Sequence, residues 1–142
     1  MNQLDNLVDS YYNDGYVYCL KIPSNVFGVE LVKIGKIEMK RDDTEQNVID
    51  KLLRRYNTYY VEYDVLEFMR VGNCHLAEKY IFEHLKEMHY KKEMYIHNDM
   101  KITNAFKAAL EKYPNICDRL VSVDIDVISK LNSVIRDKEG VL

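Results

Sequence analysis

The chain has 142 residues, of which 47% are hydrophobic and 30% charged, and its net charge is −3. This composition suits one domain with a buried core. It excludes a protein that coats DNA through bulk positive charge, because nonspecific phosphate binding needs clustered Lys and Arg. Apolar runs fall far short of the ~20 residues that cross a bilayer, and the first residues lack a secretory-signal pattern. We therefore expect an intracellular, cytoplasmic protein with no membrane partner.

The three cysteines show no metal-binding or disulfide pattern. Cys19, Cys74 and Cys117 form no CxxC pair, and the adjacent Cys74 and His75 have no second Cys/His pair to complete a zinc-finger spacing. We expect free thiols in a reducing cytosol and no structural zinc.

The first half of the chain predicts a helix, a hairpin and a second helix. Residues 3–12 have a short amphipathic pattern that ends at an Asn-Asp-Gly turn. Residues 16–22 and 29–37 are rich in β-formers and are joined by a short loop, so they should pair antiparallel. Thr44 is a good N-cap for the next helix, whose apolar residues recur at helical spacing through Tyr56.

The alternation of residues 61–71 predicts a third strand, with Val65 and Met69 on one face and Leu66 and Phe68 on the other. Asn73 should cap a helix that runs to about residue 89.

The last elements are a short strand at 93–96 and helices at 99–113 and about 122–137. The whole is predicted to be a single α+β domain over 1–142. Its small, mainly antiparallel sheet of about three or four strands should be flanked by helices, with residues 99–142 as a C-terminal helical cap.

Glu78 is out of place on the helix predicted over residues 74–89. At about 100° per residue the apolar side chains form one broad arc, and Glu78 falls inside it, between Leu85 and Phe82. A carboxylate there must be paired, protonated or bound to a cation. Two interpretations stay open: a Glu at the edge of the arc that reaches a Lys or a backbone N–H, and a metal ligand or acid–base group. His84 also lies in the arc, where we expect a hydrogen-bonded core histidine.

Two adjacent arginines differ in their place on the preceding helix. Arg54 points almost opposite to the apolar face, so it should be solvated. Arg55 lies at the border of that face, from where its guanidinium can lean over the sheet. A border Arg often only keeps its head group in water. The same place suits an Arg that binds a phosphate through two hydrogen bonds.

Four segments resemble, in order, the motifs of the GIY-YIG superfamily. Gly15-Tyr16-Val17-Tyr18 looks like the first motif, with Tyr18 on its Tyr, and Val32-Lys33-Ile34-Gly35 resembles the second, with Gly35 on its Gly. Arg55 lies on the next helix, where the family has its Arg, and the segment from Glu78 resembles the helix with the metal-binding Glu. The Lys-Ile-Gly form of the second motif is similar to the DNA-binding branch from phages and large DNA viruses. The resemblance covers residues 15–97.

The resemblance implies a nuclease-type site for phosphodiesters. In the family a Tyr activates water, the Arg stabilises the developing charge and the Glu holds one divalent cation, an arrangement that suits a phosphodiester transition state. The candidate catalytic residues are therefore Tyr18, Lys33 and Arg55. Glu78 is the candidate ligand of Mg²⁺ or Mn²⁺, and no organic cofactor is implied. The candidate nucleic-acid contacts are Tyr16, Gly35, Lys36 and Arg54.

Lys33 departs from the nuclease pattern, because nuclease members carry a second Tyr there. A desolvated Lys can act as a base or simply bind phosphate. For the polar residue that nucleases place after the final strand, Asn98 is the nearest candidate. Three functions remain: a metal-dependent endonuclease, a noncatalytic DNA- or RNA-binding protein, and an inactive module that binds a host or viral protein in an infected cell. The negative charge and the missing Tyr favour the last two, and Glu78 favours the first. We expect nucleic-acid binding, with metal-dependent cleavage left open.

The geometry of four side chains decides between these functions. We expect Tyr18, Lys33, Arg55 and Glu78 to converge on one face of the sheet. Desolvation should raise the pKa of Glu78 if the carboxylate has no partner, and Lys33 or Arg55 should lower it if either pairs with it.

Overall fold

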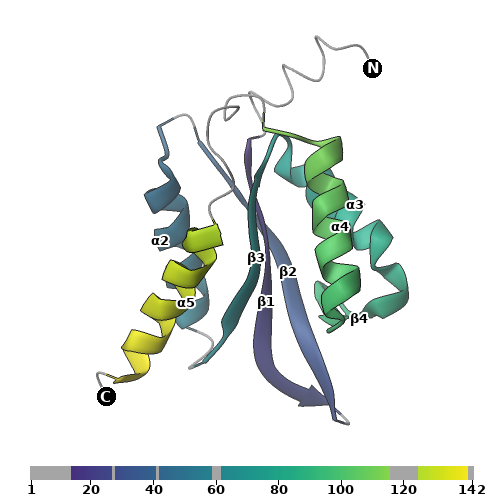
Figure 1. The fold of residues 1–142 in the computed structure, drawn as a ribbon, viewed down its shortest axis with the longest axis horizontal. Coiled ribbons are helices and arrows are strands. Elements are labelled where there is room, and N and C mark those ends of the chain that lie inside the picture. Colours follow the sequence, from purple (N-terminus) through teal and green to yellow (C-terminus); the bar gives the residue numbers. More distant parts are fainter. Residues whose placement is uncertain (1–13, 27, 41, 59–61, 116–124, 141–142) are drawn as a thin grey trace.

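A computed structural model describes residues 14–26, 28–40, 42–58, 62–115 and 125–140. In these residues the fold is α+β, with a five-stranded antiparallel sheet between two pairs of helices (Figure 1). The predicted class is confirmed, and the sheet has one strand more than the upper end of the prediction. The helix predicted at residues 3–12 and the thiol of Cys117 lie outside the described residues.

The sheet is built around one long hairpin. Strands β1 (Gly15–Val26) and β2 (Val29–Glu38) pair antiparallel, as their β-forming residues and the short loop between them predicted. Strand β3 (Asp64–Val71) pairs with the other edge of β1. On the far side of β2 lie two short strands, β5 (Met94–Ile96) and then β4 (His89–Lys91). The strand order is therefore β3-β1-β2-β5-β4.

The helices begin where the sequence places their caps. Thr44 caps α2 (Glu45–Asn57) through a capping box, and the side chain of Asn73 accepts from the backbone N–H of Leu76 at the start of α3 (Cys74–His84). Helices α4 (Asp99–Lys112) and α5 (Ile125–Gly140) follow. Within the described ranges no helix is both long and apolar enough to cross a bilayer.

Helix α3 is shorter than predicted. It ends at His84 instead of near residue 89, because the chain turns through a short 3₁₀ segment (Lys86–Met88) and then forms β4. Strand β4 was missed, since its three residues become a strand only by pairing with β5. The prediction of a core histidine at position 84 was wrong: at the helix end His84 is exposed.

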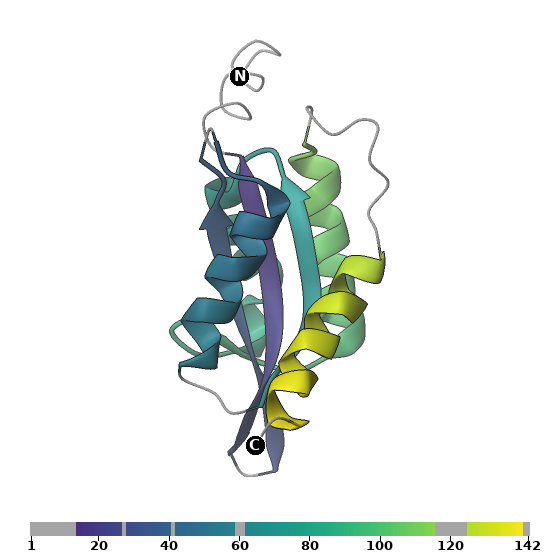
Figure 2. The same ribbon diagram turned by 90° about the vertical axis from the view of Figure 1, so that its left-hand side faces the viewer.

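The two faces of the sheet carry separate cores, here called the α2 face and the α3 face. Helices α2 and α5 cover the first, and α3 and α4 cover the second (Figures 1 and 2). Strand residues on the α2 face include Tyr16, Tyr18, Leu20, Leu31 and Ile37. Those on the α3 face include Val17, Cys19, Val32 and Ile34. Because side chains alternate along a strand, odd positions of β2 point to the α2 face and even positions to the α3 face.

A β-bulge in β3 overturns the predicted alternation of that strand. Cys19 of β1 pairs with Glu67 and the next residue, Leu20, pairs with Val65, so Leu66 is the extra residue. Val65 therefore shares the α2 face with Phe68, while Leu66 and Met69 pack against the α3 face. The prediction that Val65 and Met69 share a face was wrong for this reason.

Glu67 should make the stability of the fold depend on pH. It lies on the α3-face side of β3 beside Cys19, and burial raises the pKa of its carboxyl from 4.5 to about 7, against a hydrogen bond from Thr103 of α4 that lowers it. The folded state then holds this proton more tightly than the unfolded chain. The contribution of Glu67 to the unfolding free energy is therefore most favourable below about pH 4.5, and it is lost as the pH rises toward about 7.

Urea unfolding between pH 4.5 and 8 measures this effect. We expect Glu67→Gln to remove a decline in unfolding free energy with rising pH that the wild type shows between about pH 4.5 and 7. Identical pH profiles for the two proteins would contradict the assignment.

Candidate functional site

The ring of Tyr18 lies directly over Gly35. The two residues face each other across the β1–β2 pair, and a Cβ added to Gly35 would overlap the Tyr18 hydroxyl oxygen. The ring is 1% exposed, and its Oη lies 2.5 Å from that of Tyr56 on α2. Burial, followed by the nearby Tyr56 hydroxyl, raises the pKa of Tyr18 far above its usual value. As it stands, Tyr18 is a neutral, hydrogen-bonded core group.

Arg55 leans over the sheet, as its place on the helix predicted. Its Nη1 donates to the Tyr18 hydroxyl at 3.1 Å and to the backbone carbonyl of Lys36 at 3.4 Å. Arg54, predicted above as a nucleic-acid contact, lies about 100° around α2 from Arg55 and is exposed. Among the described residues no side-chain hydrogen bond or ion pair holds Arg54 at the sheet, so we leave it out of the candidate site. Within the described residues the structure gives Arg55 no carboxylate partner, and a guanidinium has five N–H donors, more than these contacts use.

Glu78 is buried on α3, where the side chain is 9% exposed and pairs with Lys36 at 3.3 Å between Oε1 and Nζ. Desolvation raises the pKa of Glu78, while the Lys36 ammonium opposes the rise and the more distant carboxylate of Glu93 adds to it. Of the two interpretations left open for Glu78, the structure therefore shows a Glu that reaches a Lys. That lysine is Lys36, and neither Lys33 nor Arg55, the partners considered above, pairs with it in the described residues. The net direction is nevertheless the one expected for a desolvated carboxyl group.

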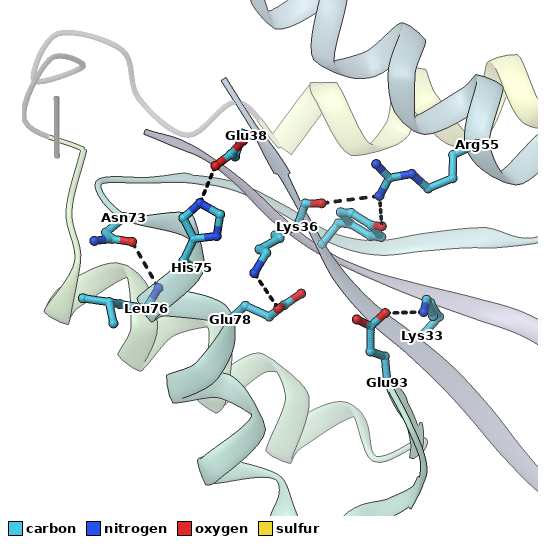
Figure 3. A network of polar contacts seen from close by, with 10 residues as sticks. Lys33, Lys36, Glu38, Arg55, Asn73, His75, Leu76, Glu78 and Glu93 are labelled. Atoms are coloured by element: carbon cyan, nitrogen blue, oxygen red, sulfur yellow. Dashed lines mark hydrogen bonds and ion pairs between the residues drawn. The ribbon is translucent and has the colours of Figure 1, made fainter. Parts of the chain in front are cut away.

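The prediction that the four candidates converge on one face was wrong for Glu78. Tyr18 and Gly35 lie on the α2 face with Arg55 above them, whereas Lys36, at an even position of β2, points to the α3 face and meets Glu78 there. Figure 3 shows Arg55 and Glu78 approaching Lys36 from different sides, one toward its carbonyl and one toward its ammonium group.

Arg55 on one face and the Lys36–Glu78 pair on the other lie beside the same edge of the sheet. Strand β5 pairs with β2 only at Leu31–Lys33. Two further backbone bonds flank these pairs, from the Ile34 N–H to the Glu93 carbonyl and from the His97 N–H to the Glu30 carbonyl. Beyond these residues, β2 has no strand partner on that side within the described chain. We call this segment, Gly35–Glu38, the β2 edge. It is flanked by Arg55 on the α2 face and by the Lys36–Glu78 pair on the α3 face.

Lys33 lies beside the β2 edge on the α2 face, two residues before Gly35. Its ammonium group forms an ion pair with Glu93, at the turn before β5 (Figure 3). Three cations, Lys33, Lys36 and Arg55, therefore gather around one stretch of strand, and carboxylates neutralise two of them.

Two other residues predicted for the site, Tyr16 and Asn98, have structural roles in the fold. Tyr16 is 3% exposed, stacks on Phe68 and donates to Glu45, so its ring is part of the core. The side chain of Asn98 accepts from the Lys101 N–H and caps α4. Sequence reasoning missed the polar roles of two other residues. Tyr56 was taken only as a core residue, although the hydroxyl of a buried tyrosine usually needs a hydrogen-bond partner. Glu93 carried no pattern that marked it as the partner of Lys33.

A divalent cation does not fit the side chains as they stand. No group of three or more His, Cys, Asp or Glu suited to a metal occurs among the residues the structure describes. The carboxylate of Glu78 faces the Lys36 ammonium, and that of Glu93 faces Lys33. A metal ion would have to displace an ammonium group that already compensates the carboxylate. This donor set suits Lys–Glu ion pairs, and we derive no chemical step through a metal.

Comparisons of the chain with protein-family models, with curated proteins and with solved structures gave no match.

Gly35→Ala tests the close approach of Tyr18 to β2. The added methyl group would push the Tyr18 ring away from Arg55 and Tyr56, and we expect the unfolding free energy to fall by about 1–3 kcal/mol, as in overpacked cores. In a Tyr18→Leu background, which vacates the space, the same substitution should cost clearly less. Equal costs in the two backgrounds, measured by urea unfolding, would show that the ring does not set the requirement for glycine.

Proposed function

We propose that the β2 edge binds the phosphodiester backbone of a nucleic acid, with Arg55 as the principal phosphate contact, Lys33 on the same face of the sheet and Lys36 on the opposite side of the same strand. The observation that carries the proposal is the position of Arg55, which is held by two oxygen acceptors at the sheet edge, with no carboxylate partner in the described residues. A planar guanidinium fixed in this way is suited to bidentate phosphate recognition.

The two lysines support the same ligand. Both are half-buried; Lys36 belongs to the β2 edge and Lys33 lies two residues before it. Each is held by one carboxylate, Lys33 by Glu93 and Lys36 by Glu78. An arriving phosphate can share or replace these carboxylates, because a Lys ammonium is a compact charge with three donors on a flexible stem. The site would therefore bind through a local cluster, which agrees with a chain whose net charge is −3.

The motif resemblance supports a polynucleotide as the source of that phosphate. The segments that resemble the GIY-YIG motifs supply Tyr18, Gly35, Arg55 and Glu78, and the first three lie together at the β2 edge. The Lys-Ile-Gly form is similar to the DNA-binding branch from phages and large DNA viruses, so DNA is the ligand that we propose.

Binding without cleavage is the form of the function that the geometry favours. A base that activates water must reach the substrate and lose its proton readily. The Tyr18 hydroxyl is buried, hydrogen-bonded and raised in pKa, and Glu78 is paired with Lys36 on the other side of β2. The Lys33 ammonium group already has a partner, the carboxylate of Glu93.

Arg55→Ala and Arg54→Ala form a matched pair for the test, because they are the same residue type one position apart on α2. We expect Arg55→Ala to weaken association with labelled DNA and to flatten the log–log salt dependence by roughly one unit, and Arg54→Ala to leave both nearly unchanged. Fluorescence anisotropy over a salt series measures both quantities. Equal effects of the two variants would contradict the proposed site.

Glu78→Gln belongs in the same titration, because it keeps the shape of the side chain and removes the charge that competes for Lys36. Binding should persist or tighten, and adding Mg²⁺ should produce no cleavage. Mg²⁺-dependent cleavage lost in Glu78→Gln would overturn the noncatalytic form of the proposal. No salt-sensitive association with any nucleic acid would refute it and favour the protein-binding alternative.

A further inference from the structure

The β4–β5 hairpin carries an exposed aromatic ring that is not part of the proposed site at the β2 edge. Tyr90, in the middle of β4, is 49% exposed, whereas most tyrosines in the described chain are buried or half-buried. It lies at a register shift between the pairs His89–Tyr95 and Lys91–Met94, so it is not opposite a residue of β5.

The hairpin is also rich in lysine. Lys91 and Lys92 adjoin Tyr90, and all three residues of β4 are exposed. Lys92 has a positive φ of 53° in the two-residue turn, and its carbonyl lies 2.6 Å from a ring nitrogen of His89. In the described part of the chain neither Lys91 nor Lys92 forms an ion pair with a carboxylate. These two charges are therefore available to an anionic ligand.

The register joins this hairpin to the proposed phosphate site. Met94 of β5 pairs with Lys33 of β2 on one side and with Lys91 of β4 on the other. Directly paired residues point to the same face of a sheet, so Lys33 and Lys91 share the α2 face, about two strand spacings or ~10 Å apart. The hairpin is held to β2 by the Glu93 carbonyl, which accepts from Ile34, and by the Lys33–Glu93 ion pair.

We infer that Tyr90 is a stacking platform for an unpaired base of a single-stranded nucleic acid whose backbone runs from Arg55 past Lys33 to Lys91. Exposed aromatic rings beside cationic side chains are the elements from which single-strand sites are built. Lysines on an edge strand also discourage strand–strand aggregation, but that role does not need an exposed ring between them. The inference rests on the proposed function, since the same strand would contact Arg55.

The chain contains no tryptophan, so Tyr90→Trp introduces a single indole at the platform, whose emission can be excited apart from that of the tyrosines. Val134 on α5 is 51% exposed and belongs to the helix beside β3, at the other end of the strand order, so Val134→Trp is the matched control. Short oligothymidylate and oligouridylate, and a DNA duplex, serve as probes. We expect the single strands to quench the indole emission of Tyr90→Trp and not that of Val134→Trp, because stacking on a base quenches indole emission. The duplex should quench Tyr90→Trp less.

Anisotropy with the same probes completes the test. Tyr90→Ala should weaken single-strand binding about tenfold, while Tyr90→Phe, which keeps the ring, should bind almost as the wild type does. Quenching by only one of the two oligomers would identify DNA or RNA as the source of the strand. Single-strand binding that depends on Arg55, but with no quenching of Tyr90→Trp and no weakening in Tyr90→Ala, would overturn the platform and leave the proposed function standing. No binding of any probe would overturn both.

Discussion

The buried hydroxyl of Tyr18 is the group on which the arrangement at β2 depends. The ring packs onto Gly35, where only a residue without a side chain leaves room, and its hydroxyl ends inside the α2 face. A buried hydroxyl must be hydrogen-bonded, and its partners are Tyr56 and Arg55 on α2. These bonds fix how α2 lies on the sheet and bring the guanidinium of Arg55 to the carbonyl of Lys36.

The position of Arg55 at the Lys36 carbonyl determines how the charged groups are distributed around the β2 edge. The backbone carbonyl of Lys36 binds Arg55 on one face, while its ammonium binds Glu78 on the other, so this residue connects two helices that never share a face. The cost of burying Glu78 is visible in the direction of its pKa, which desolvation raises in spite of the lysine. Glu78 is therefore the group that holds Lys36 in place, and Arg55 is the group that remains for a ligand.

Much of the fold could be predicted, because local patterns determine it. Runs of β-forming residues joined by a short loop identified the hairpin, and Thr44 and Asn73 identified two helix starts. The helical wheel placed Glu78 in the apolar arc, and its side chain is buried. A wheel shows which side of a helix is buried but not which face of the sheet that helix covers. This depends on the connection from β3 to α3, and so the sequence could not place Glu78 relative to Tyr18. Strand β4 and the bulge at Leu66 escaped prediction because they arise from pairing between strands.

Contact between a nucleic-acid backbone and the β2 edge beside Arg55 is the central proposal. Backbone amide chemical shifts, followed while a short DNA oligonucleotide is added to the ¹⁵N-labelled protein, test it most directly. We predict that the largest changes fall on residues 33–38 of β2 and on the C-terminal turn of α2, with little change along α5. Changes confined to α4 or α5, or no changes at a concentration where anisotropy shows binding, would contradict it.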